Sequence, residues 1–258
     1  MKKFIAITAL LCAMCVVFSC DNSSQPPVFK AGDDLAQAIA DLKSGETLYV
    51  TDDVDLDAPI TIPAGKAVVI QLTGDSEIEY EGSGSAFIVE DGGSLVIKGQ
   101  SAGSGKSMKD GAAGGTVIEA DGPVEALFKV GPGATLELEN VTLIGENKPC
   151  SGLILLNNPA EDPNGPVIKL TDVRAVASKS VITSYAHEEA NDLCSNDEGC
   201  VHFANATVEI KGGYFEKTSS DAYFGNENCI YLIACKGLIE GAEVVSRNGA
   251  CIEVSCSD

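Results

Sequence analysis

The amino-acid sequence predicts an all-β solenoid made of short strands that repeat along the chain. Glycine is abundant, with 27 residues, while aromatic side chains are sparse, with 8 Phe, 6 Tyr and no Trp. This balance suits short strands joined by tight turns better than a helical core. Hydrophobic residues make up 45% of the 258 positions, which is enough for a substantial core. A strand–turn–strand unit recurs along the chain, as is typical of repeat proteins.

The first twenty residues have the features of an export signal. Two lysines precede an apolar run over residues 4–18, which is shorter than a membrane-spanning helix. The tetrapeptide VFSC that ends at Cys20 resembles the lipobox of bacterial lipoproteins, although Phe18 stands where a smaller residue is usual. The resemblance implies that residues 1–19 are a signal peptide and that Cys20 carries acyl chains such as palmitate, a durable membrane anchor. The alternative is an ordinary secretory signal followed by a coincidental cysteine.

Export would place the mature chain outside the cytoplasm, in a bacterial cell envelope, with the choice of membrane left open. Residues 20–29 are mostly polar and include two prolines, as expected of a flexible tether. Without the two leader lysines, 15 basic residues stand against 38 acidic ones, a formal charge of −23. This charge excludes nucleic acid as a partner, and it repels anionic head groups, so the lipid itself must hold the chain to the membrane.

One amphipathic helix is expected over residues 33–43, with Asp33 as its N-cap. Leu35, Ile39 and Leu42 fall on one face of this helix. After the helix, short apolar or alternating runs separated by Gly, Asp and Pro predict strands. The first of these runs are 47–51, 59–62, 67–72, 86–89 and 94–99.

Five later segments align without gaps, each with a strand, a turn residue and the start of a second strand. The shared turn position always holds Gly, Asn or Asp, which tolerate a left-handed backbone at low cost. Successive turns are 29 to 41 residues apart, so loops of variable length join a constant unit. We expect these insertions to lie on one side of a solenoid. The segments are SLVIKG, TLELENVTL, PVIKLTDVRA, ATVEIKGGYF and KGLIEGAEVV, with Gly99, Asn140, Asp172, Gly212 and Gly241 at the turn.

This pattern resembles the pectin-lyase-like family, whose coils also turn at Gly, Asn or Asp and whose first coil is covered by a helix. The resemblance extends over residues 30–258, taken as one domain. It implies a right-handed, single-stranded parallel β-helix with helix 33–43 as its N-terminal cap. The rival fold is an antiparallel β-sandwich, which also has short strands but does not repeat a turn position. Residues 250–258 look like the start of a further coil.

Enzymes of this family act on polysaccharides in a groove on one outer sheet, with clustered carboxylates, calcium and a basic residue. The sequence motifs that carry this chemistry are missing here. Arg174 and Arg247 are the only arginines, and neither lies in an RxPxxR pattern. The hydrolase set NTD, DD, GHG and RIK is also missing, and neither His187 nor His202 has flanking glycines. We therefore expect no catalytic residues of the family type.

Three short segments, GCVHF, NCIYL and ACIEV, share a pattern that would stack if they occupied equivalent strands. Imidazole, phenol and carboxylate groups side by side could bind a sugar or a metal, or exchange protons. The alternative is that any exposed face of a solenoid carries polar residues, and no motif supports a reaction. The outward column would consist of His202, Tyr231 and Glu253, two residues after Cys200, Cys229 and Cys251.

The mature chain has seven cysteines beyond Cys20, so at least one remains unpaired within a monomer. Cys194 and Cys200 are candidates for a short disulfide loop in an oxidising compartment. No CxxC motif or tetrahedral ligand spacing is present, so no metal site of the zinc type is expected. The acidic runs 52–57 and 188–192 could hold Ca²⁺, but they lack the EF-hand pattern, and solvated charge is the alternative. No other cofactor is expected.

Three functional hypotheses follow from these patterns. The first is a lipid-anchored envelope protein whose β-helix is a non-catalytic display or binding surface, with a glycan, a host protein or another envelope component as its ligand. The second is a divergent polysaccharide lyase or glycoside hydrolase whose active site lies outside the family motifs. The third is a structural spacer.

Overall fold

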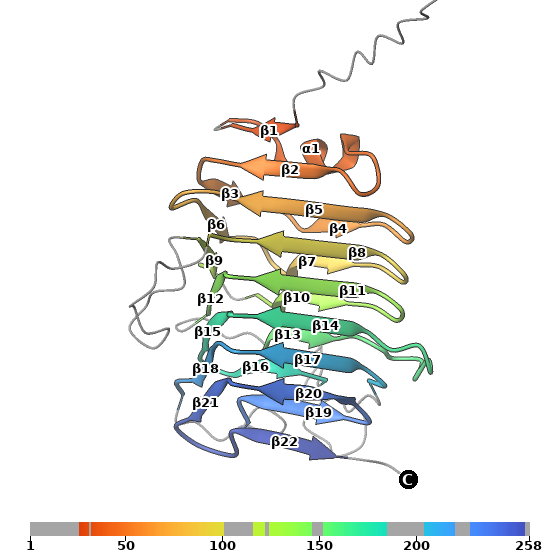
Figure 1. Cartoon of the computed structure of the whole chain (residues 1–258), viewed down its shortest axis with the longest axis vertical. Helices are drawn as coiled ribbons and strands as arrows, with labels where there is room; N and C mark the ends of the chain where they lie inside the picture. The colour runs from red at the N-terminus through yellow and green to blue at the C-terminus, as the bar shows by residue number, and fades with distance from the viewer. Residues whose placement is uncertain are drawn as a thin grey trace, which may run out of the picture.

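The chain folds as a right-handed parallel β-helix with three all-parallel sheets, as the computed structural model in Figure 1 shows. It describes residues 26–30, 32–100, 116–121, 124–145, 152–184, 204–219 and 228–255. Sheet A comprises β1 (Val28–Phe29), β2 (Thr47–Val50), β5 (Ala67–Leu72), β8 (Ser94–Lys98), β11 (Thr135–Glu139), β14 (Val167–Thr171), β17 (Thr207–Lys211) and β20 (Lys236–Glu240).

The other two sheets run alongside sheet A. Sheet B comprises β3 (Val54–Leu56), β6 (Glu77–Tyr80), β9 (Val117–Ala120), β12 (Thr142–Gly145), β15 (Arg174–Ala177), β18 (Tyr214–Lys217) and β21 (Glu243–Ser246). Sheet C comprises β4 (Ile60–Ile62), β7 (Ser85–Val89), β10 (Ala126–Val130), β13 (Gly152–Leu156), β16 (Ser180–Thr183), β19 (Ile230–Ile233) and β22 (Ile252–Ser255).

Each coil contributes one strand to each sheet, in the order A, B, C. Strands β2 to β22 therefore form seven successive coils. The predicted all-β solenoid is confirmed, and the antiparallel sandwich is excluded because every strand pair described is parallel. The expectation that residues 250–258 begin a further coil is wrong, because β22 pairs with β19 and completes the seventh coil.

The N-terminal end of the solenoid is covered by α1 (Leu35–Asp41) and β1. Leu35, Ile39 and Leu42 are buried against the core, as the helical periodicity predicts. The N-cap is Asp34 rather than Asp33, since the Asp34 side chain accepts a hydrogen bond of 3.1 Å from the Gln37 amide. Asp33 instead accepts one from the Lys30 amide.

The predicted turn position lies between sheets A and B, and its residues stack in register. Asn140, Asp172, Gly212 and Gly241 have φ angles of 54°, 49°, 69° and 69°, all in the left-handed region. Gly99 occupies the same position for another reason. A Cβ atom there would lie 2.2 Å from the Asn140 carbonyl oxygen, so this glycine is required by the close approach of the next coil.

Parallel register carries each inward side chain onto its equivalent in the next coil. In sheet A, Ile97 pairs with Leu138, which pairs with Leu170, and all three are buried. In sheet C, the rings of Phe87 and Phe128 stack with centroids 5.4 Å apart and planes 14° from parallel. Stacked aromatic pairs contribute about 0.5–1.5 kcal/mol beyond the area they bury. The core therefore consists of apolar columns that run along the solenoid.

The longer connections lie at all three corners, so the expectation that insertions share one side is wrong. Residues 99–116 connect sheet A to sheet B, residues 146–151 and 218–229 connect B to C, and residues 157–166 and 184–206 connect C to A. An insertion at any corner leaves the strand register intact, because the strands before and after it still pair with neighbouring coils.

The close approach of successive coils can be tested at two glycines with positive φ. Gly213 (φ 94°) would place a Cβ 2.4 Å from the Val173 carbonyl oxygen, whereas a Cβ at Gly74 (φ 71°) would meet nothing within 4 Å. We expect Gly74→Ala to cost about 1–2 kcal/mol, from the left-handed backbone alone. Gly213→Ala should cost about 3 kcal/mol or more, because backbone atoms must also move.

The measurement is the urea midpoint of each variant at an unchanged slope. Equal losses at Gly213 and Gly74 would show that contact between coils does not limit this position.

Candidate functional site

The outer face of sheet B carries a ladder of carboxylates over its first coils. Asp55 of β3 pairs in register with Glu79 of β6, which pairs with Glu119 of β9. Val54 and Leu56, on either side of Asp55, are buried, so strand alternation turns Asp55 outward. We call Asp55, Glu79, Glu81, Glu119 and Asp121 the carboxylate ladder.

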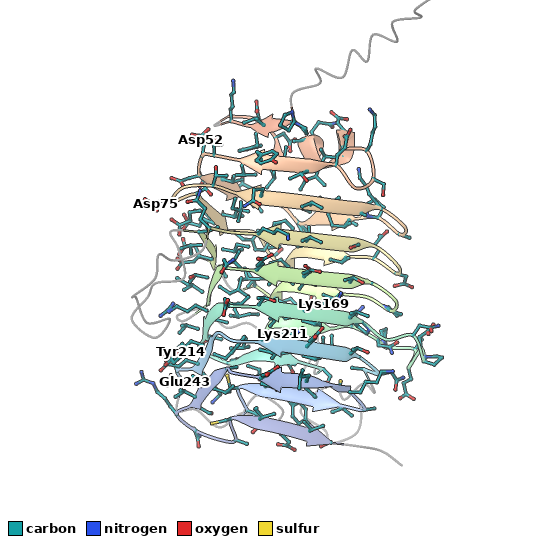
Figure 2. All side chains as sticks on the ribbon, in the orientation of Figure 1. Asp52, Asp75, Lys169, Lys211, Tyr214 and Glu243 are labelled. Carbon is teal, nitrogen blue, oxygen red and sulfur yellow. The ribbon has the colours of Figure 1, made fainter. Side chains whose placement is uncertain are left out.

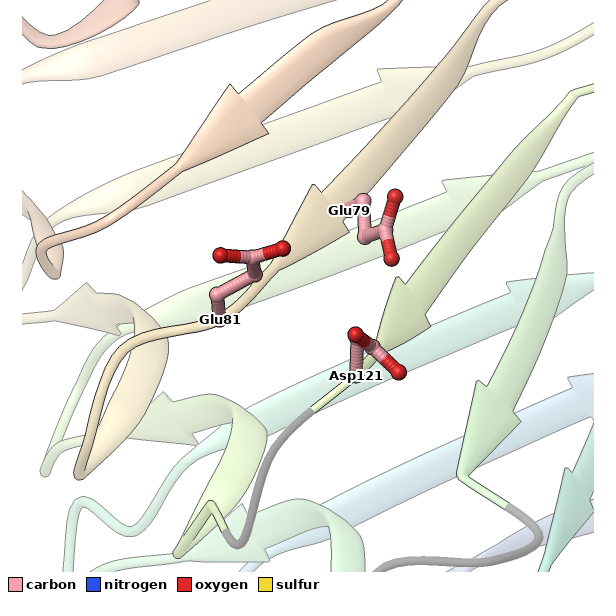
Figure 3. A group of neighbouring side chains, drawn as sticks. All are labelled: Glu79, Glu81 and Asp121. Carbon is pink, nitrogen blue, oxygen red and sulfur yellow. The ribbon is translucent and has the colours of Figure 1, made fainter.

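Three members of the carboxylate ladder converge, as Figure 3 shows. Glu79, Glu81 and Asp121 each offer a carboxylate oxygen, and these oxygens lie within 4.8 Å of one another. Partial burial raises the pKa of Glu79 above its ordinary value, and the charges of Asp121, Glu77, Glu81 and Asp55 raise it further. Hard cations such as Ca²⁺ prefer oxygen donors of this kind. Exposed acidic groups are common without an ion, so the geometry alone assigns no metal.

The acidic run 52–57, which the sequence leaves open as a Ca²⁺ site or as solvated charge, contains the short strand β3. Asp53 accepts a 3.0 Å hydrogen bond from the Glu77 amide, which connects the first two coils. Asp52 and Asp75 lie at the edge of the molecule near the N-terminal coils (Figure 2). The second predicted acidic run, 188–192, lies outside the described residues. Glu79, Glu81 and Asp121 were missed because they belong to two different coils.

A second polar cluster lies on sheet B near the last coils. The strands β15, β18 and β21 place Arg174, Tyr214 and Glu243 in register. Figure 2 shows Tyr214 and Glu243 near each other at the C-terminal coils. Glu216 accepts a 2.8 Å hydrogen bond from the Tyr214 hydroxyl and a 3.2 Å contact from Arg247. The Nε atom of Arg174 is buried and has no hydrogen-bond partner among the residues that the structure describes.

The chemistry of this second cluster is limited by the Tyr214 hydroxyl. Partial burial, followed by the hydrogen bond and charge of Glu216 and the charge of Glu243, raises the pKa of Tyr214 to about 12. The phenol therefore stays protonated near neutral pH and acts as a hydrogen-bond donor rather than a base. The cluster joins the last two coils and offers Glu243 to solvent.

Tyr231 and Glu253, two members of the predicted outward column, are register partners in sheet C. Glu253 accepts a 2.6 Å hydrogen bond from the Asn228 side chain. On its other side, Tyr231 pairs with Thr183 of β16, so Thr183 holds the position that the sequence alignment gave to His202. His202 itself lies outside the described residues, and no binding role follows for this column.

The same register places Cys229 beside Cys251, with the Cys229 amide bonded to the Ala250 carbonyl oxygen. The position on the other side of Cys229 belongs to Val181, not to Cys200. Burial raises the pKa of the Cys229 thiol to about 12, with a smaller contribution from Cys251, so this thiol is not an activated nucleophile. The predicted Cys194–Cys200 disulfide and the Cys20 lipidation site lie outside the described residues.

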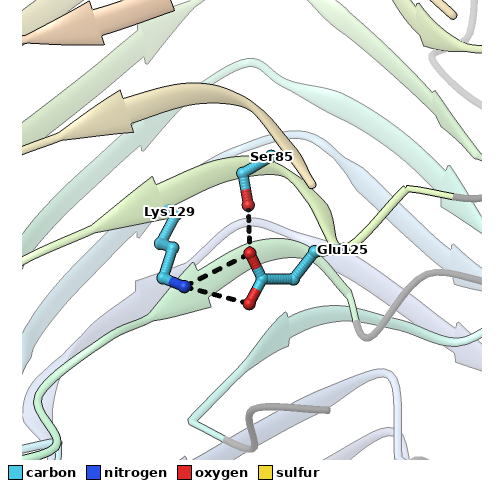
Figure 4. Close-up of polar contacts among 3 residues, drawn as sticks. All are labelled: Ser85, Glu125 and Lys129. Carbon is cyan, nitrogen blue, oxygen red and sulfur yellow. Dashed lines mark hydrogen bonds and ion pairs between the residues drawn. The ribbon is translucent and has the colours of Figure 1, made fainter. Parts of the chain in front are cut away.

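On sheet C, a side-chain network connects two coils (Figure 4). Glu125 accepts a 2.8 Å hydrogen bond from the Ser85 hydroxyl and pairs with Lys129 at 3.0 Å. Ser85 is buried, and both charged side chains are mostly covered. The acidic side chain of this network is paired with a lysine, unlike those of the carboxylate ladder on sheet B. The network holds β7 against the turn before β10.

Comparisons with protein-family models, with curated proteins and with solved structures find no match to this chain. None of the helices that the structure describes has the length and apolar character needed to cross a membrane. The fold therefore defines the class, a parallel β-helix, and the candidate sites stand on their own geometry.

Burial of Glu79, together with like-charge repulsion in the carboxylate ladder, predicts a stability that depends on pH. Because the pKa of folded Glu79 lies above its ordinary value of 4.5, its ionisation disfavours the folded state at neutral pH. This cost decreases as the pH falls through the raised pKa and vanishes below the ordinary value. We therefore expect Glu79→Gln to raise the thermal midpoint at about pH 7 but not at about pH 4.

The control for the ladder is Glu137→Gln on sheet A. Glu137 pairs with Lys169 in the next coil, so its removal should not stabilise the chain at either pH. A Glu79→Gln midpoint at or below that of the wild type near pH 7 would contradict a raised pKa at Glu79 in the folded chain.

The network in Figure 4 predicts an unequal cost for two glutamate substitutions. Glu125→Ala leaves the buried Ser85 hydroxyl without its acceptor and should cost about 1–2 kcal/mol. Glu209→Ala removes only exposed interactions, with Lys211 and with its register partner Lys169, and should shift the urea midpoint less. We expect the urea midpoint of Glu125→Ala to be lower than that of Glu209→Ala. The reverse order would show that the network adds no stability.

Proposed function

We propose that the chain is a lipid-anchored protein of the bacterial cell envelope whose β-helix serves as a binding or display surface without catalysis. The VFSC tetrapeptide at Cys20 and the polar tether over residues 20–29 support the anchor. We include in this proposal that the chain is a bacterial lipoprotein and that its β-helix is of the pectin-lyase-like type. The chain would be extracytoplasmic, with a glycan or a protein as its ligand.

The observation that carries the binding role is the unbroken register of seven coils. Register sets outward residues in straight columns along the solenoid, such as Asp55, Glu79 and Glu119 on sheet B. Repeat proteins use extended surfaces of this kind to contact long partners.

Polysaccharide cleavage is the second candidate function, and we place it behind binding. The arginine and histidine motifs of the resembled family are missing from the sequence. Near neutral pH, Tyr214 stays protonated because its pKa is about 12, so it does not replace the missing base.

The anchor is tested by palmitate labelling of cells that express the wild type, Cys20→Ala or Cys229→Ala. We expect label and membrane association for the wild type and their loss in Cys20→Ala, since that change removes the only thiol of the lipobox. Cys229→Ala is the matched control, because Cys229 is buried in the solenoid and should not affect labelling. An unlabelled wild-type chain, or a labelled Cys20→Ala chain, would remove the anchor from this proposal.

A further inference from the structure

The last coil leaves part of the apolar core uncovered. Ile252 and Val254 pair in register with Ile230 and Leu232, which are buried. In β22, however, these core positions are 38% and 51% exposed. Leu238 of β20, on the outer face of sheet A, is 49% exposed. In the part of the chain that the structure describes, no helix or strand lies beyond this coil (Figure 1).

The opposite end of the solenoid is protected. There α1 covers the core, and the edge strands of the three sheets, β1, β3 and β4, have only two or three residues each. Pro26 and Pro27 precede β1 and have no amide hydrogen to donate to another strand. Short edges and prolines are common devices against pairing between chains. At the C-terminal end, β20 is a five-residue edge strand without such protection in the described residues.

The backbone of β20 has hydrogen-bonding groups that face away from β17. The Lys236 amide donates to the Ala206 carbonyl oxygen, and the Glu240 carbonyl oxygen accepts from the Gly212 amide. These residues therefore direct their backbone groups toward β17. Since backbone groups alternate along a strand, those of Gly237 and Ile239 point to the open edge.

The sequence of β20 is complementary to itself when two copies run antiparallel. With Leu238 opposite Leu238 of a second copy, Gly237 faces Ile239 and Lys236 faces Glu240, twice each. The Gly237–Ile239 pairs bring together the four free amides and four free carbonyls of the edge, as an antiparallel ladder requires. Lys236 and Glu240 then form the non-hydrogen-bonded pairs, in which the side chains of the two strands are closest. Opposite charges attract and like charges repel in such pairs.

We propose that two copies of this chain associate end to end through antiparallel pairing of β20 with β20, about a two-fold axis at Leu238. Sheet A then continues from one copy into the other with its outer face on the same side. The exposed Leu238 side chains meet across the axis. Charge complementarity selects a second copy as the occupant, because both Lys236–Glu240 pairs form only in this register.

The test uses charge variants of the full chain purified in a non-ionic detergent. Lys236→Glu and Glu240→Lys each turn both attractive pairs into repulsive ones. We expect each variant alone to dimerise at least about tenfold more weakly than the wild type. An equimolar mixture of the two variants restores both pairs and should recover a heterodimer. The matched control is Lys169→Glu, the same charge change on the outer face of sheet A but in the interior strand β14, which should dimerise like the wild type.

Light scattering after size exclusion, over a dilution series, gives the mass of each sample, and circular dichroism verifies that each variant is folded. Every sample contains the same detergent, so a pair of lipid anchors in one micelle cannot distinguish the variants. A monomeric wild type overturns the proposal, as would happen if another part of the chain or a different partner covers β20. The proposal is also overturned if Lys236→Glu dimerises as strongly as the wild type, or if the mixture of the two folded variants stays monomeric. These outcomes do not depend on whether Cys20 is lipidated.

Discussion

In-register parallel hydrogen bonding between successive coils is the constraint on which the rest of this structure depends. A slip of one residue would exchange the inner and outer faces of a strand and send the core side chains to solvent. The left-handed bend at Asn140, Asp172, Gly212 and Gly241 helps to prevent such a slip, because it returns the chain to the same corner in each coil. The core columns and the outer columns both follow from this repetition.

Register also imposes costs that the sequence has to tolerate. Equivalent positions in neighbouring coils lie side by side, so identical charges at equivalent positions repel each other. Asp55, Glu79 and Glu119 illustrate the cost on sheet B, while Lys98 and Glu139 on sheet A form a 3.0 Å ion pair across two coils. The acidic column remains compatible with the fold because its backbone bonds and the buried residues on the inner face stabilise the same strands.

The sequence predicted the repeat and the core better than it predicted the surface columns. The turn position and the buried face of α1 were predictable because Gly, Asn and Asp tolerate a left-handed backbone and because helical periodicity is strong. The strand at Val54–Leu56 was missed because Asp55 and its acidic neighbours disguised a short alternating strand. GCVHF resembled NCIYL locally, but insertions occur at all three corners along the solenoid, and local similarity does not identify the sheet to which a segment belongs. The register shows that β16 pairs with β19 instead.

The two ends of the solenoid differ in a way that determines how assembly would stop. A contact between unlike ends would join chains head to tail and continue into a filament. Here the N-terminal end presents α1, the two-residue β1 and two prolines, so it offers little backbone for such a contact. Pairing of β20 with itself uses the C-terminal edge of sheet A in both copies and leaves the two N-terminal ends pointing outward. A closed dimer, rather than a growing fibre, is therefore the assembly that this distribution of edges favours.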